Sequence, residues 1–273
     1  MAFQRASNTS VRRSHTERAY KRDTAAPIKF AESPEIAGGA FQDGYVCLYG
    51  KPKIGKSTLA SYLPGAYFLS TEKGLKFLRV RQTFLSSWED FKAFVLWAEK
   101  HTIETRDVKM WVIDTATILA KHCMYGVCAD LGISHPSDED YGKGWEAFAD
   151  EFTGWVLRLC ALGKGMMFVC HESVQEITSR CVKINHYGPD LPRTAYRTIM
   201  PMCDIVLHMA YVEDGEASEL GRLRCLYSQP SETRDAGDRS HRLSTELKFA
   251  KESAAVKRIL LAYTDRKETK SDD

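Results

Sequence analysis

The sequence has no long apolar segment. Of its 273 residues, 44% are hydrophobic and 27% are charged, the proportions of an ordinary globular protein, and its apolar runs are far too short to cross a bilayer. The first residues include arginines but no continuous apolar stretch with the small-residue cleavage site of a secretory signal. This composition excludes an integral membrane protein, and we expect a cytoplasmic chain with no membrane partner.

The sequence also lacks the paired cysteines of a zinc site. Cys123 and Cys128 lie beside His122, but without the paired short spacings that such a site needs. Five other cysteines lie within apolar runs, where free thiols behave as small hydrophobic side chains: Cys47, Cys160, Cys170, Cys203 and Cys225. We expect reduced thiols rather than disulfides.

Charge is unevenly distributed although the formal net charge is only +2. Residues 1–30 contain seven lysines and arginines against two acidic residues, and few apolar side chains. We predict a flexible basic arm over residues 1–40, a folded core over 41–265 and a charged tail over 266–273. The arm is either a solvated tail or a contact for nucleic acid or protein, and the sequence leaves both open.

Short apolar runs alternate with longer amphipathic segments from Gly44 onward. Four runs are apolar nearly throughout, as in strands buried on both faces of a parallel sheet: 45–50, 66–71, 110–115 and 166–171. Residues 204–211 and 222–229 look like edge or hairpin strands, whereas 86–101 and 144–163 have apolar residues at helical spacing. This order predicts an α/β fold in which helices flank a mostly parallel central sheet, with a C-terminal antiparallel strand pair.

A phosphate-binding motif, G-x-x-x-x-G-K-[ST], follows the first of these runs. Its residues are Gly50, Lys51, Pro52, Lys53, Ile54, Gly55, Lys56 and Ser57, and Thr58 comes next. Glycines let the backbone amides turn toward phosphate oxygens, Lys56 would reach the β- and γ-phosphates, and the Ser57 hydroxyl would ligate magnesium. A chance match in a basic loop is the alternative. The spacing and its context predict a site for ATP and Mg²⁺.

Two carboxylates are candidates for the rest of this site. Asp114 ends the third apolar run, where it would complete the magnesium shell or cap the next helix. Thr115 follows it, so no glutamate stands there to activate water. Glu72 follows the second run and would lie at the same edge of the sheet, where it can deprotonate the attacking water. A solvated turn glutamate is the alternative reading.

The fourth run brings His171 to this edge, where a polar side chain could sense the γ-phosphate or simply end the strand. Residues 173–200 then predict a long basic loop that interleaves aromatic and cationic side chains, as contacts to single-stranded DNA require. A polar loop without such contacts is the alternative. The candidate DNA-binding residues are Arg180, Lys183, Arg193 and Arg197.

In their order, these segments resemble the RecA-like core ATPases, most closely the phage-encoded single-domain nucleotide-binding or AAA-type ATPases of the recombination class. The matching segments lie between residues 41 and 247: "LYGKPKIGKSTLA", "FLSTEKGLKFL", "WVIDTATIL", "GKGMMFVCHE" and "RLRCLYSQPSETRDAGDRSHRLSTEL". The resemblance implies a DNA-stimulated ATPase that binds single-stranded DNA and assists phage recombination or strand annealing in the cytoplasm of a bacterial host. It also implies self-association into a filament or ring, with a single-strand-binding or replication protein as a further partner.

The resemblance further implies roles for individual residues. Glu72 looks like the catalytic glutamate beside Lys56, and His171 occupies the position of a γ-phosphate sensor that is a glutamine in the bacterial recombinase. Arg234, Asp238 and Arg239 lie where such ATPases place residues that reach a neighbouring subunit's nucleotide, and either arginine is a candidate to act in trans. Two other functions stay open: a P-loop kinase of a small acceptor, and a replication accessory or loader ATPase that acts through protein partners.

Overall fold

The computed structural model of the protein describes residues 39–179, 182–212 and 223–264. Residues 1–38 of the predicted arm, the predicted tail and Arg180 lie outside these ranges. The proposed division into arm, core and tail therefore stays a prediction. In the part of the chain that the structure describes, no helix combines the length and hydropathy needed to span a membrane.

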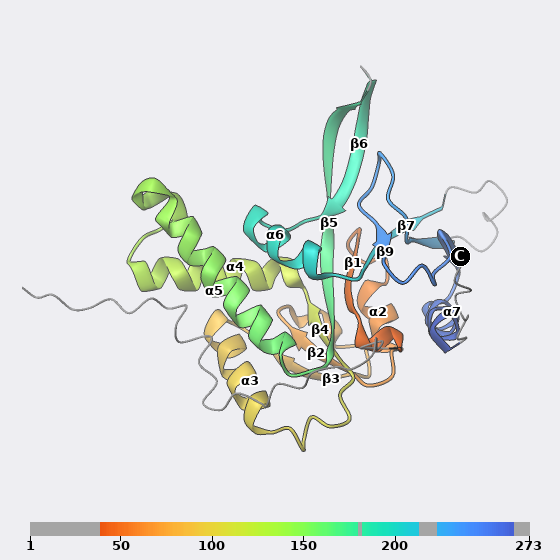
Figure 1. Ribbon diagram of the computed structural model, residues 1–273, viewed down its shortest axis with the longest axis horizontal. Coiled ribbons are helices and arrows are strands. Elements are labelled where there is room, and N and C mark those ends of the chain that lie inside the picture. The colour runs from red at the N-terminus through yellow and green to blue at the C-terminus, as the bar shows by residue number, and fades with distance from the viewer. Residues whose placement is uncertain (1–38, 180–181, 213–222, 265–273) are drawn as a thin grey trace, which may run out of the picture.

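A ten-stranded sheet lies at the centre of the described residues (Figure 1). Its main path runs β10-β8-β7-β1-β5-β4-β2-β3, and the neighbours from β7 to β3 are parallel. This arrangement confirms the predicted α/β fold. The parallel strands are β1 (Tyr45–Gly50), β2 (Ala66–Ser70), β3 (Arg81–Phe84), β4 (Met110–Asp114), β5 (Gly165–Ser179) and β7 (Ile205–Tyr211).

The C-terminal strands are antiparallel, as predicted. β8 (Arg224–Tyr227) pairs with β7, and β10 (Glu246–Phe249) pairs with β8, while the short β9 (Gly237–Asp238) meets the start of β7. Residues 204–211 were predicted as an edge or hairpin strand, and β7 forms a hairpin with β8. It is not an edge strand, because it also pairs with β1 inside the sheet, and its five residues before Ala210 are all buried.

Helices cover both faces of the sheet (Figure 1). One face packs against α3 (Trp88–Lys100), α4 (Ala116–Leu131), α5 (Lys143–Cys160) and α6 (Arg193–Met202), and the other against α2 (Lys56–Ser61) and α7 (Glu252–Thr264). In β1, Cys47 and Tyr49 belong to the first core and Val46 and Leu48 to the second. Neighbouring side chains of a strand point to opposite faces, so a strand covered on both sides must be apolar throughout.

Local signals in the sequence place the two predicted helices correctly. The Ser87 hydroxyl accepts a hydrogen bond from the Asp90 amide at 3.2 Å, and Asp90 accepts one from the Ser87 amide at 3.1 Å, which closes a capping box before α3.

The five cysteines of the apolar runs are buried free thiols, as expected. Short 3₁₀ helices complete the described elements: Phe41–Asp43, Lys73–Leu75, Pro136–Asp138 and Asp140–Gly142.

The segment predicted as a long loop is folded instead. β5 continues beyond the body of the sheet and forms a projecting antiparallel hairpin with β6 (Val182–Pro189), and α6 follows (Figure 1). The prediction of a loop over 173–200 is therefore wrong. An isolated two-stranded ribbon has little core to cover, so its strands alternate polar and apolar residues without the continuous apolar run that reveals a buried strand.

Candidate nucleotide-binding site

The phosphate-binding motif joins β1 to α2, as its spacing predicts. A Cβ at Gly50 would lie 2.3 Å from the Met209 carbonyl oxygen, so no side chain fits there. Gly55 has φ +110°, a left-handed conformation that favours glycine. Lys51, Pro52 and Lys53 form the exposed outer part of the loop, Ile54 is buried beneath it, and Thr58 lies in the first turn of α2.

Lys56 is buried, and its ammonium group is hydrogen-bonded to backbone carbonyl groups. Its side chain is 6% exposed, and its Nζ donates hydrogen bonds to the carbonyl oxygens of Gly50 at 2.7 Å and Lys51 at 2.8 Å. Burial lowers the pKa of this ammonium, and the charge of Asp114 opposes that effect. Among the described residues no carboxylate forms an ion pair with Lys56. A buried cation held only by neutral carbonyls fits a site that receives phosphate.

Ser57 and Asp114 meet at the position predicted for magnesium. The Ser57 hydroxyl donates to Asp114 Oδ1 at 3.1 Å, and Asp114 is 8% exposed. Burial raises the pKa of Asp114, and the nearby charge of Glu72 raises it further, while the hydrogen bond from Ser57 opposes both. A cation would stabilise this carboxylate in its charged form, and hydroxyl and carboxylate oxygens are ligands that Mg²⁺ accepts. The residues therefore fit the metal.

Glu72 lies at the same edge of the sheet, immediately beyond β2. Ser70 and Asp114 are register partners in β2 and β4, so the two strands end together. The Thr115 hydroxyl donates to Glu72 Oε2 at 2.5 Å, and the Thr115 amide donates to the Thr71 hydroxyl at 2.9 Å. Thr115, which the sequence argument treated only as the place without an acid, thus holds the carboxylate of Glu72. A hydroxyl residue directly after Asp114 is the signal that could have found it.

His171 joins this group from β5. Its Nε2 lies 3.8 Å from Glu72 Oε2, and its backbone is the register partner of Gly50. The Nδ1 atom of His171 is buried and has no hydrogen-bond partner within residues 39–179, 182–212 and 223–264. The structure therefore brings together Glu72, Asp114, Lys56 and His171, the residues predicted for nucleotide chemistry, at the edge where β1, β2, β4 and the body of β5 end.

A buried polar cluster that the sequence argument missed lies behind His171. Glu172 accepts a hydrogen bond from His208 Nε2 at 2.8 Å, and both side chains are 4% exposed. The His208 ring stacks on Tyr49 with centroids 4.7 Å apart, and the Tyr49 hydroxyl donates to the carbonyl oxygens of Tyr187 at 3.0 Å and Asp235 at 2.6 Å. Burial lowers the pKa of His208. A histidine inside the apolar run 204–211 was the available signal.

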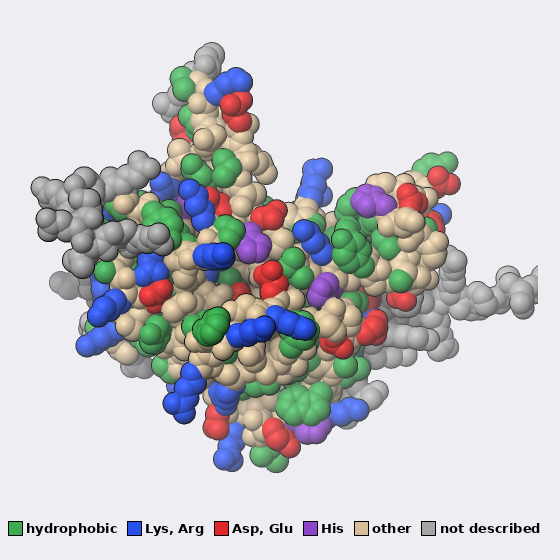
Figure 2. All heavy atoms as spheres, turned by 180° about the vertical axis from the view of Figure 1, so that it is seen from behind, with side chains coloured by type: hydrophobic (Ala, Val, Ile, Leu, Met, Phe, Trp, Pro, Cys, Tyr) green, Lys and Arg blue, Asp and Glu red, His purple; other side chains and the backbone are tan. Residues whose placement is uncertain are grey.

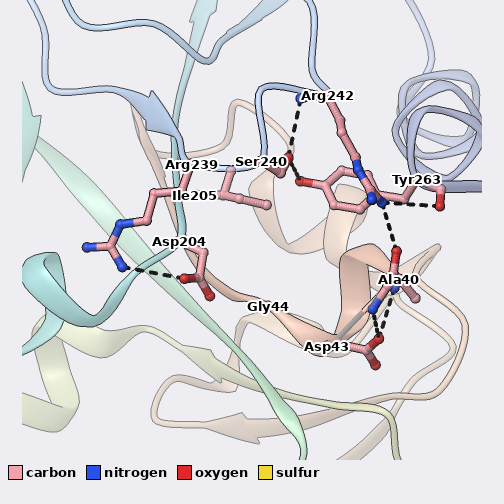
Figure 3. Close-up of a pocket in the computed structure, with 10 residues that line it drawn as sticks. Ala40, Asp43, Gly44, Asp204, Ile205, Arg239, Ser240, Arg242 and Tyr263 are labelled. Carbon is pink, nitrogen blue, oxygen red and sulfur yellow. Dashed lines mark hydrogen bonds and ion pairs between the residues drawn. The ribbon is translucent and has the colours of Figure 1, made fainter. Parts of the chain in front are cut away.

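The two arginines predicted to act across an interface lie near opposite ends of the parallel strands. Arg234 stacks 3.6 Å from the centroid of the Tyr227 ring, beside the base of the hairpin. Arg239 lines a pocket of about 460 Å³ where β1 and β7 begin, and its NH1 lies 3.5 Å from Asp204 Oδ1 (Figure 3). That pocket is at the far end of these strands from the phosphate loop. A role for either arginine in a neighbouring subunit stays a prediction.

The candidate DNA-binding residues are divided between the hairpin and α6. Lys183 pairs with Glu176 across the hairpin, with Nζ and Oε1 2.7 Å apart, so its charge is already balanced. Arg193 and Arg197 are exposed one turn apart on α6, and no ion pair involves either of them among the described residues. Figure 2 shows the protruding hairpin and a face on which positive and negative side chains are interspersed. Among the described candidates, the positive charges without an ion pair are therefore those of Arg193 and Arg197 on α6.

Comparison with known proteins agrees with this geometry. A family model described as an AAA domain matches residues 44–240, which include the phosphate loop, Glu72, Asp114, His171 and the hairpin. No curated protein matches the sequence. Because the matched range covers more than half of the chain, this protein belongs to the AAA domain family and carries a nucleotide-binding domain of the P-loop ATPase type.

Proposed function

We propose that this protein hydrolyses ATP and grips single-stranded DNA while ATP is bound, as a self-associating ATPase of homologous recombination or strand annealing. One observation carries the proposal. β5 places His171 3.8 Å from Glu72 and then continues into the hairpin that leads to α6. A change at the γ-phosphate can therefore move a surface element that is suited to contact DNA.

In the proposed hydrolysis, Lys56 binds the β- and γ-phosphates of the substrate, and Ser57 and Asp114 hold Mg²⁺, which would neutralise charge on the phosphate oxygens. Glu72 orients the attacking water and accepts its proton. The hydrogen bond from Thr115 fixes one oxygen of Glu72 and leaves the other free for water. His171, whose Nε2 lies 3.8 Å from the Glu72 carboxylate, would change position when the γ-phosphate leaves.

The proposed path from ATP to DNA runs through β5. His171 and Glu172 are neighbours in this strand, and Glu172 is tied to His208 inside the buried cluster. The cluster includes the backbone of Tyr187 in β6 through its bond from Tyr49, which directly precedes the phosphate loop. A shift of His171 would therefore be transmitted to both strands at the base of the hairpin.

The proposed DNA contact is α6, with the hairpin beside it. Arg193 and Arg197 are four residues apart and exposed on one face of the helix, so both can reach one phosphate backbone. Charges of both signs are interspersed on the face that Figure 2 shows, which would keep the contact local. Arg234 and Arg239 would contact neighbouring subunits in an assembly.

A replication accessory ATPase that acts through a protein partner is the second candidate. It is favoured by the hairpin itself, on which Val174 is 52% and Val182 60% exposed while Lys183 is neutralised by Glu176. Exposed apolar side chains on a projecting ribbon suit a protein contact better than a nucleic-acid contact. This candidate predicts weak binding of DNA at any salt concentration.

Fluorescence anisotropy of a labelled single-stranded oligonucleotide would test the proposal. Binding should be tight with a non-hydrolysable ATP analogue and weak with ADP, and the double substitution Arg193→Ala/Arg197→Ala should weaken it. The dependence of log affinity on log salt should also become shallower by about 0.7 for each phosphate that the variant no longer neutralises. Lys257→Ala/Arg258→Ala removes the same charge from exposed positions of α7 and is the matched control.

Three results would point elsewhere. Equal losses in the two double variants would show that only net charge matters and would remove α6 as the contact. Failure to bind DNA at low salt, with capture of a purified replication protein, would favour the accessory ATPase. ATP consumption that required a small acceptor and ignored DNA would favour a kinase.

A further inference from the structure

Arg224 of β8 contacts the phosphate loop from outside the motif. Its NH1 donates to the Ile54 carbonyl oxygen at 3.0 Å and to Glu252 Oε1 at 2.5 Å, and its NH2 donates to the Ala250 carbonyl oxygen at 2.6 Å. The guanidinium also lies 5.1 Å from the centroid of the Phe249 ring. The side chain is 13% exposed. A largely buried cation thus joins the loop to the C-terminal strand pair and α7.

The contact with Ile54 fixes the direction of a peptide group in the loop. The peptide bond between Ile54 and Gly55 is trans and planar, so its carbonyl and its N–H point in opposite directions. A carbonyl held toward Arg224 turns the Gly55 N–H away from both Arg224 and the Glu252 carboxylate. An anion can approach the amide on that side without meeting the negative charge of Glu252.

The same ion pair lies directly against residue 55. A Cβ at this position would lie 2.5 Å from Glu252 Oε1 and 2.6 Å from Arg224 NH1. A side chain at residue 55 would therefore displace the ends of both side chains of the pair. The second glycine of the motif is favoured by its positive φ, and it lets the loop approach a pair of residues that lie 169 or more positions later in the chain.

We infer that Arg224 is a positioning residue that holds the phosphate loop in the geometry that binds the phosphates of ATP, with Glu252 neutralising its charge. It acts on ATP through the Ile54–Gly55 peptide and not by contact with phosphate. The inference rests on ATP binding, which is part of the proposed function. Lysine would not replace Arg224, because one ammonium cannot reproduce the planar fork that reaches Ile54, Glu252 and Ala250 together.

The test compares Arg224→Ala and Arg224→Lys with Arg258→Ala. Arg258 donates to the Lys248 carbonyl oxygen at 2.8 Å, in the same C-terminal unit, and it has no contact with the loop among the described residues. Two quantities are measured: the Kd for MgATP, and amide hydrogen exchange of residues 50–58 in the nucleotide-free protein. Thermal unfolding of each variant checks that it is folded.

Arg224→Ala should weaken MgATP binding about tenfold or more, since it removes a charge-assisted hydrogen bond to a buried carbonyl. It should also speed exchange in the loop, and Arg224→Lys should do the same to a smaller extent. Arg258→Ala should change neither quantity. If Arg224→Ala does not fold, Arg224→Lys, which keeps a cation beside Glu252, serves the same comparison.

Unchanged exchange or unchanged affinity in a folded Arg224 variant would overturn the inference. Equal effects in Arg258→Ala would overturn it too, because they would indicate general loosening of the C-terminal unit. If the wild type failed to bind MgATP, the proposed function would fail. Exchange in the nucleotide-free protein would then still decide whether Arg224 holds the loop.

Discussion

Charged groups at the two ends of the parallel strands differ in their surroundings. Where the strands end, burial lowers the pKa of Lys56 and raises that of Asp114, so each is held in surroundings that disfavour its charged form. Where they begin, Asp204 accepts a hydrogen bond from the Tyr45 amide at 3.0 Å and lies 3.5 Å from Arg239. The charges of Lys56 and Asp114 are thus disfavoured by their surroundings, whereas those of Asp204 and Arg239 have partners within the chain.

Two buried aspartates show this contrast most clearly. Asp238, at the edge where the strands begin, accepts hydrogen bonds from the amides of Ser240, Arg242 and Leu243 at 2.9 to 3.0 Å and from the Ser240 hydroxyl at 2.6 Å. Asp114 accepts one from Ser57. A carboxylate with many donors stabilises a fold, and one with few is available to a cation.

The largest expected effect is on activity at the phosphate edge. Lys56→Ala should lower the rate of ATP hydrolysis at least about 100-fold, because it removes the cation that we propose stabilises charge on the transferred phosphate. Arg242→Ala removes a cation at the other edge, where NH1 donates to the Gly39 carbonyl oxygen, and should leave hydrolysis unchanged. Steady-state phosphate release measures the hydrolysis rate of both variants. Similar losses of rate in the two would show that the two ends of the strands do not differ in function.

The next effect is on stability. Asp238→Ala should lower the free energy of unfolding by about 2–4 kcal/mol, since it leaves several donors of the turn without an acceptor. Asp238→Asn keeps one acceptor oxygen and should cost less. Urea unfolding of the nucleotide-free proteins gives both values. A neutral Asp238→Ala would show that solvent replaces these bonds and that the carboxylate is not structural.

The smallest effect has the opposite sign. Asp114→Asn should raise the unfolding temperature of the metal-free protein at neutral pH, by about 2–4 °C for each kcal/mol of relieved burial. Because the pKa of Asp114 is raised in the folded protein, its contribution to the free energy of unfolding is greatest when it is protonated. That contribution is lost as pH rises through the raised pKa. The advantage of Asp114→Asn should therefore grow from acidic to neutral pH. Melting curves of both proteins across that pH range measure this difference. A difference that shrank toward neutral pH would contradict the inference that burial disfavours the charged form of Asp114.

The parallel half of the fold could be predicted because its signals are local. β1, β2, β4 and the body of β5 are continuous apolar runs, and the phosphate motif follows the first of them at a fixed spacing. A strand that is buried on both faces shows this in its own residues. The same logic placed Asp114 and Glu72 at one edge, since parallel strands that are neighbours end together.

Contacts between distant segments could not be predicted in this way. Glu172 and His208 meet because β5 and β7 flank β1, and Arg224 reaches Ile54 because the C-terminal strands extend the sheet beside the phosphate loop. No motif in the sequence marks either pair of residues as neighbours in space. The hairpin was missed for a different reason, because its strands cover little core and so lack an apolar run.

Steady-state ATP hydrolysis and ATP binding by Glu72→Gln, measured beside the wild type, test the central claim most directly. We expect that the wild type hydrolyses ATP, that Glu72→Gln binds ATP with similar affinity, and that its hydrolysis falls about 10²- to 10⁴-fold because the proposed general base is removed. Normal turnover in Glu72→Gln would contradict the assignment of the carboxylate that Thr115 and His171 surround.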